Sequence, residues 1–100
     1  QLEDVDLREN KLKDLPTSFS KLVHLKELYL CFNKFTHIPN VIRLCTKLEL
    51  INISYNSLEK IPNFIVDLQH LQELDFSENN LKKLPFFFCN QASLFSATIR

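Results

Sequence analysis

Three residue types recur along this chain with a period of 23 residues. The four prolines are Pro16, Pro39, Pro62 and Pro85. Four asparagines and five leucines keep the same step: Asn10, Asn33, Asn56, Asn79 and Leu2, Leu25, Leu48, Leu71, Leu94. A fixed period of about 20 to 50 residues is typical of stacked repeats, in which each unit completes its core against its neighbours. The period predicts one repeat domain over residues 1–100, a fragment of a longer protein, with repeats at 2–24, 25–47, 48–70 and 71–93 and a partial repeat at 94–100.

Each position of the repeat has a physical role. Leu28 and Leu30 alternate with polar residues, which is the period of a short strand with one buried face. Asn33 follows; its amide can bond to neighbouring backbone groups and it tolerates turn dihedrals, so a column of asparagines can satisfy the backbone at a bend. A proline then suits a first helical position, because its φ is fixed and its missing N–H costs little there. We therefore expect single helical turns at 40–45 and 63–68 on the outer face.

The segments LKELYLCFNKFTHIP and LQELDFSENNLKKLP carry this pattern and resemble the leucine-rich repeat family. Their length and their Ile-Pro or Leu-Pro ending are similar to the 23-residue intracellular subclass of Ras suppressor, Erbin and Scribble. The resemblance implies an α/β fold: a right-handed solenoid with a parallel concave sheet and short helical turns on the convex side. Repeat four departs from the pattern, since Gln91 stands where a leucine is expected.

The composition disfavours several kinds of chemistry. The chain has no glycine, which phosphate-binding loops and nucleophile elbows require. Its three cysteines, Cys31, Cys45 and Cys89, are widely spaced and its histidines are scattered, so we expect reduced thiols and neither a disulfide framework nor a metal site. We predict no catalytic residues, no cofactor and no enzyme activity. No apolar run is long enough to cross a membrane, so no transmembrane segment is expected.

The formal net charge is zero, with 12 acidic and 12 basic residues, which argues against a nucleic-acid partner. The 23-residue period nevertheless separates the charges. Strand positions that point away from the core carry nine of the 12 acids but three of the 12 basic residues, a formal charge of −6. The rest of the chain then carries +6. This separation predicts a protein partner with a basic rim.

A group of aromatic and apolar residues lies among these outward strand positions in repeats two and three. Its members are Tyr29, Phe32, Leu50 and Tyr55, with Cys31 beside them. The aromatic rings could simply cover the strand ends, but a clustered patch usually marks an interaction surface. The predicted partner-binding residues are Asp6, Glu27, Tyr29, Cys31, Phe32, Leu50, Asn52, Tyr55, Glu73, Asp75 and Glu78.

Together these features predict a non-catalytic protein–protein interaction module that binds through its concave strand face. The resemblance implies a cytoplasmic signalling or scaffold protein, with a partner of the small-GTPase type. The alternative is a substrate-recognition or regulatory repeat domain of a larger enzyme whose catalytic domain lies outside these residues. Open solenoid ends at Leu2 and Ile99 expose core positions, so we expect the isolated fragment to self-associate. The Asn52-Ile53-Ser54 sequon leaves glycosylation open.

Overall fold

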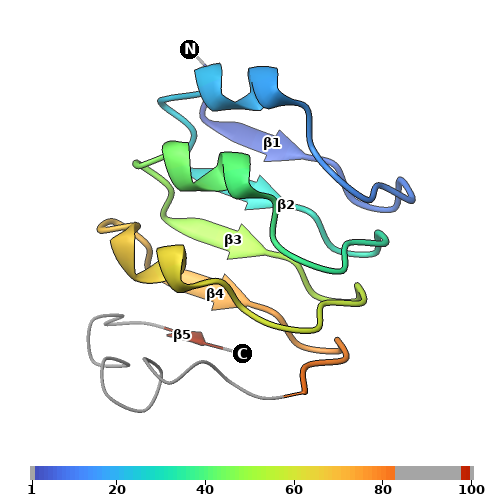
Figure 1. Cartoon of the computed structure of the whole chain (residues 1–100). Helices are drawn as coiled ribbons and strands as arrows, with labels where there is room; N and C mark the ends of the chain where they lie inside the picture. The colour runs from blue at the N-terminus through green and yellow to red at the C-terminus, as the bar shows by residue number, and fades with distance from the viewer. Residues whose placement is uncertain (1, 83–97, 100) are drawn as a thin grey trace.

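The computed structural model describes residues 2–82 and 98–99. Five parallel strands lie side by side in one sheet, in chain order (Figure 1). They are β1 (Asp4–Asp6), β2 (Glu27–Tyr29), β3 (Leu50–Asn52), β4 (Glu73–Asp75) and β5 (Thr98–Ile99). Three 3₁₀ helices, η1 (Thr17–Lys21), η2 (Asn40–Leu44) and η3 (Asn63–Asp67), follow the first three strands and cover one side of the sheet. This arrangement confirms the predicted parallel sheet with short helical turns on its other side.

The strand register follows the sequence period through β4. Val5 lies opposite Leu28, Leu28 opposite Ile51, and Ile51 opposite Leu74, each pair 23 residues apart. Leu74 pairs with Ile99, which is 25 residues further on, because the connection from β4 to β5 is two residues longer than the others. The period places Ala97 opposite Leu74, and the structure corrects that register. Gln91 and Cys89 lie outside the described residues.

The core is completed by stacking. Repeats two and three have neighbours on both sides, and their apolar positions are fully or almost fully buried, Cys45 among them as a small hydrophobic residue in a leucine position. In repeat one, Leu2 is 53% exposed and Val5 is half-buried, because β1 has the sheet on one side of it. The solenoid therefore draws its stability from contacts between repeats.

A side-chain amide bridges adjacent repeats where each strand ends. The Oδ1 atom of Asn33 accepts hydrogen bonds from the backbone N–H groups of Asn10 (3.0 Å) and Leu12 (2.9 Å) in the preceding repeat. Its Nδ2 atom donates to the carbonyl oxygens of Leu7 (2.9 Å) and Leu30 (3.0 Å). Asn56 and Asn79 make similar bridges, in which Oδ1 accepts one N–H, from Phe35 and Leu58 respectively, and Nδ2 donates to carbonyl oxygens of both repeats. The predicted role of the asparagine column is confirmed.

The residue before each asparagine has a left-handed backbone. The φ angles of Glu9, Phe32, Tyr55 and Glu78 are 61°, 58°, 54° and 55°. Such a conformation costs an L-residue about 1–2 kcal/mol, and the chain has no glycine to avoid that cost. The N–H groups of Phe32 and Tyr55 donate to carbonyl oxygens of the next repeat, both at 3.1 Å, which helps to hold the bend in place. The sequence suggested that the asparagine would adopt the turn dihedrals, but the positive φ angle belongs to the residue before it.

The return segments differ from the expected helical turns in one respect. Pro16, Pro39 and Pro62 precede the 3₁₀ helices instead of occupying their first position, with φ angles of −68°, −56° and −73°. Each proline carbonyl accepts the N–H of the residue three positions later, as in the 3.0 Å bond from Phe19 to Pro16. The proline ring thus fixes the approach to the helix without removing a hydrogen bond from it.

The substitution Asn33→Asp tests the amide bridge. It preserves side-chain shape but places an oxygen against the carbonyls of Leu7 and Leu30. We expect the free energy of unfolding to fall by about 3 kcal/mol, because a buried acceptor then faces acceptors. The matched substitution Asn80→Asp, at an exposed position, should change it by less than about 0.5 kcal/mol. Urea denaturation measures both, and equal stability of the two variants would contradict the bridge's role.

Candidate functional site

The outward-facing residues of the first four strands and the residues that flank these strands form a surface that we call the strand face. Its columns run across the repeats, so residues 23 apart lie side by side. Asp6, Phe32, Tyr55 and Glu78 are exposed there. The half-buried members of the predicted site are Glu27, Tyr29, Leu50, Asn52, Glu73 and Asp75.

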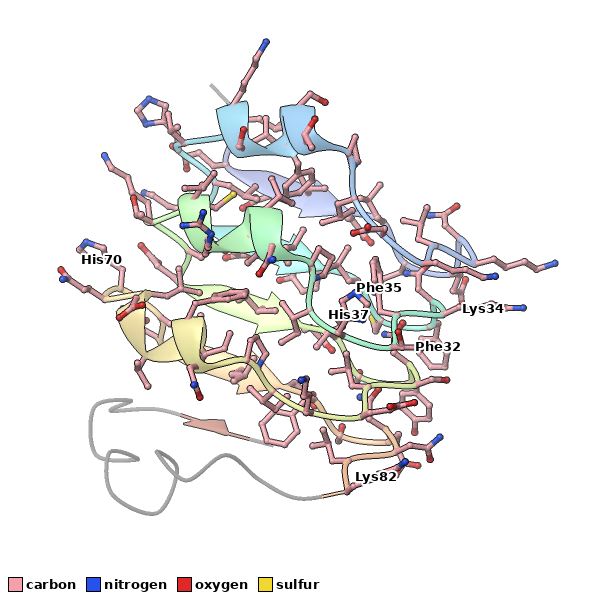
Figure 2. All side chains as sticks on the ribbon, in the orientation of Figure 1. Phe32, Lys34, Phe35, His37, His70 and Lys82 are labelled. Carbon is pink, nitrogen blue, oxygen red and sulfur yellow. The ribbon has the colours of Figure 1, made fainter. Side chains whose placement is uncertain are left out.

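Phe32 and Tyr55 form a stacked aromatic pair. Their ring centroids are 4.5 Å apart and the ring planes are inclined by 8°. Neighbouring strands in a sheet are about 4.8 Å apart, so equivalent positions in adjacent repeats bring two rings into van der Waals contact. Phe32 lies at the loop edge of the coil, where the strands have ended (Figure 2). The two side chains remain 50% and 49% exposed, so the pair presents apolar surface to solvent.

A guanidinium group lies over the other aromatic ring of the strand face. The Cζ atom of Arg8 is 5.8 Å from the centroid of the Tyr29 ring. Arg8 also makes a two-pronged contact with Asp6, with its Nε 2.9 Å from Oδ1 and its Nη2 2.7 Å from Oδ2, which lowers the pKa of that carboxyl group. The Tyr29 hydroxyl donates to Glu27 at 2.8 Å, and this hydrogen bond raises the pKa of the phenol. Tyr29 is therefore engaged within the chain.

Two polar residues of the predicted site close the ends of their own strands. The Oδ1 atom of Asn52 accepts from the backbone N–H (3.1 Å) and the hydroxyl (2.7 Å) of Ser54. Asp75 makes the same pair of hydrogen bonds with Ser77, at 3.0 and 2.7 Å. Both side chains have a structural role beside any contact with a partner.

The prediction that Cys31 is exposed beside the aromatic residues is wrong. Cys31 is 5% exposed, and burial raises the pKa of its thiol. In the same column Ser54 is also buried, Ser77 is half-buried and the longer Arg8 is exposed. The thiol acts as a small, protonated, apolar group.

Leu50 lies apart from the aromatic pair. It begins β3 and is paired between Glu27 and Glu73, five residues before Tyr55 and at the opposite end of the strand. The predicted cluster therefore divides into the Phe32–Tyr55 pair at the ends of the strands and Leu50 at their starts. The pair is the part that gathers exposed aromatic surface.

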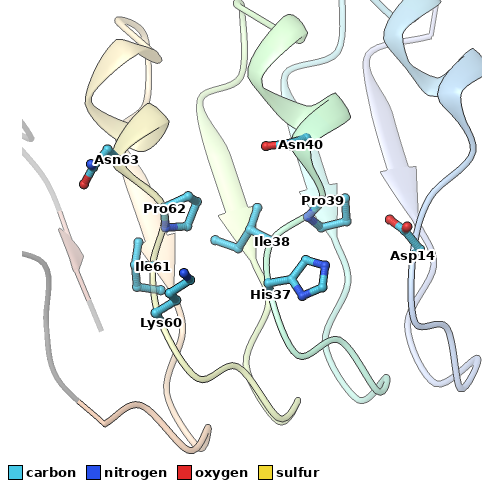
Figure 3. Close-up of a pocket in the computed structure, with 9 residues that line it drawn as sticks. All are labelled: Asp14, His37, Ile38, Pro39, Asn40, Lys60, Ile61, Pro62 and Asn63. Atoms are coloured by element: carbon cyan, nitrogen blue, oxygen red, sulfur yellow. The ribbon is translucent and has the colours of Figure 1, made fainter.

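A hollow that the residue pattern did not reveal lies beside the return segments, which run from the strand ends to the 3₁₀ helices (Figure 3). It is lined by Pro39 and Pro62, by the buried Ile38 and Ile61, and by His37. Ile38 and Ile61 are 23 residues apart, as are Pro39 and Pro62. The sequence period could therefore have shown that these return-segment residues lie side by side. The Nδ1 atom of His37 is hydrogen-bonded to the Thr36 hydroxyl at 3.1 Å.

The structure describes the possible metal ligands and helices of residues 2–82 and 98–99. There, no group of three or more histidine, cysteine, aspartate or glutamate side chains is arranged to hold a metal ion. In the same part of the chain, no helix has the length and apolar character needed to cross a membrane.

The burial of Cys31 and Cys45 predicts slow alkylation. Burial raises the pKa of both thiols above the ordinary value of 9.0, so the reactive thiolate is scarce at pH 8 and access is restricted. We expect iodoacetamide to modify both at least about tenfold more slowly than it modifies a Thr46→Cys variant at its exposed new thiol. Peptide mass spectrometry measures the rates. Equal rates at Cys31 and at the introduced thiol would place Cys31 on the surface after all.

Comparisons with known proteins agree with this geometry. Residues 1–58 and 24–81 match the model of a family described as leucine rich repeat. The solved structure of a leucine-rich repeat protein from Leptospira interrogans is similar, with a TM-score of 0.75 and 36% sequence identity over 81% of this chain. This chain spans 21% of the length of that structure. The comparison with curated protein sequences found no match to this chain.

Proposed function

The chain belongs to the leucine-rich repeat family, whose repeats generally serve as protein-interaction modules, and we propose that it binds a partner protein through its strand face. The Phe32–Tyr55 pair carries this proposal, because two large aromatic side chains stack on each other while each remains about half exposed. Aromatic residues at the centre of an interface often supply most of its binding energy. The strand register fixes their backbone positions before a partner arrives, which lowers the entropy lost on binding.

The charge around the pair favours a partner with a basic rim. Glu9 and Glu78 occupy the same column as the aromatic pair, one at each end of it, and both are exposed. Glu3 and Asp4 add two further exposed carboxylates at the start of β1, although Lys26 lies 3.9 Å from Glu3. Complementary charge of this kind accelerates association and discriminates between partners.

The cellular setting is proposed from sequence resemblance. The 23-residue repeats resemble those of cytoplasmic signalling and scaffold proteins, and we assign the protein to that setting as a non-catalytic component. A partner of the small-GTPase type rests on the same resemblance alone.

Site-specific photo-crosslinking tests the binding face. Two variants of the full-length protein are expressed in its own cells. A benzophenone amino acid replaces exposed Gln72, just before β4, in one variant and exposed Asp67, in η3, in the other. We expect a crosslinked protein from position 72 and none from position 67. The yield at 72 should fall by roughly half or more when cell extract is brought from about 0.1 to about 0.5 M salt before irradiation, because salt screens exposed charges. Crosslinks from position 67 alone would refute binding through the strand face.

A further inference from the structure

We propose that the hollow beside Phe32 binds one arginine side chain of the partner protein, with the guanidinium group between the Phe32 ring and the Glu9 carboxylate. The inference rests on the proposed function, since it names the chemical group by which the strand face holds its partner. The hollow lies at the ends of β1 and β2, in repeats one and two. The hollow is lined by Asp6, Arg8, Glu9, Cys31 and Phe32.

One face of the Phe32 ring is available to a ligand. Its other face lies against Tyr55, with centroids 4.5 Å apart and planes nearly parallel. Because the two rings stack along the column of equivalent positions, the free face of Phe32 turns toward the next member of that column, Glu9. The N–H of Glu9 donates to the carbonyl oxygen of Cys31 at 3.2 Å, which fixes the backbone of Glu9 beside repeat two.

The charges in the hollow leave room for one further cation. Asp6 and Arg8 neutralise each other through their ion pair of 2.7 Å. The Glu9 carboxylate has neither a hydrogen bond nor an ion pair within the described part of the chain, and the Cys31 thiol is buried and uncharged. The hollow therefore holds two carboxylates and one guanidinium group, a net charge of −1 next to an exposed aromatic face, and the Arg8 charge that Glu9 also attracts is held by Asp6. A cation that stacks on the ring and pairs with the carboxylate would satisfy both groups.

The adjacent residues show the same chemistry within the chain. The Arg8 guanidinium lies over the Tyr29 ring, and both carboxylate oxygens of Asp6 accept hydrogen bonds from it. We call such a site, an aromatic ring with a carboxylate beside it, an arginine seat. Arginine suits such a seat better than lysine, because its planar group can stack on a ring and present two N–H donors to one carboxylate. The hollow beside Phe32 offers a second seat of this kind, with Phe32 in place of Tyr29 and Glu9 in place of Asp6.

Fluorine NMR with small probes tests the seat. Phe32 is replaced by 4-fluorophenylalanine in the full-length protein, which is titrated with Nα-acetylarginine methylamide. We expect a saturable shift of the fluorine resonance. The matching citrulline compound, which is neutral, and the lysine compound should each bind at least roughly fivefold more weakly. Equal binding of citrulline or lysine would overturn the assignment to arginine.

A matched pair of variants locates the carboxylate. Glu9 and Glu59 are both exposed, but Glu59 lies between β3 and η3, outside the strand face, and does not line the hollow. We expect Glu9→Gln to weaken binding of the arginine probe by at least roughly threefold and Glu59→Gln to leave it unchanged. Equal effects of the two substitutions would refute the seat.

The two proposals fail separately. Crosslinking from position 72 without arginine-probe binding would leave the strand face as the interface and remove only the arginine seat. Arginine-probe binding without crosslinking from that position would retain the seat and refute the wider interface.

Discussion

The amide group of Asn33, repeated in Asn56 and Asn79, joins each repeat to the one before it, and the rest of the structure depends on this bridge. Its oxygen accepts two backbone N–H groups of the preceding repeat, while its nitrogen donates to carbonyl oxygens of both repeats. An insertion within a repeat would move the amide away from these groups. The bridge thereby maintains the 23-residue register in which β1–β4 pair.

The strand face follows from that register. Adjacent repeats place Phe32 beside Tyr55 at the strand spacing, and the same column places a carboxylate beyond each ring. The left-handed backbone of this column is shared by Glu9 and Glu78 as well as by the aromatic pair, so it belongs to the repeat and not to one ligand. What differs between repeats is the side chain that the column presents, which is how one scaffold can recognise different partners.

The sequence period was sufficient to predict the sheet and the asparagine bridges, because both depend on equivalent positions lying side by side. It could not predict the burial of Cys31, which depends on how far a short side chain reaches between longer neighbours. It also grouped Leu50 with the aromatic pair, since membership of one face does not show how far apart two residues lie along a strand. The longer connection before β5 shifted a register that the period alone had set, from Ala97 to Ile99.

Hydroxyl-radical footprinting tests the strand face most directly, because aromatic side chains react with the radical in proportion to their exposure. The full-length protein is footprinted alone and then saturated with the partner recovered by crosslinking. Binding through the strand face predicts that oxidation of Phe32 and Tyr55 falls several-fold, while oxidation of exposed His37, beside the return segments, stays the same. Protection of His37 with unchanged oxidation of the aromatic pair would contradict it.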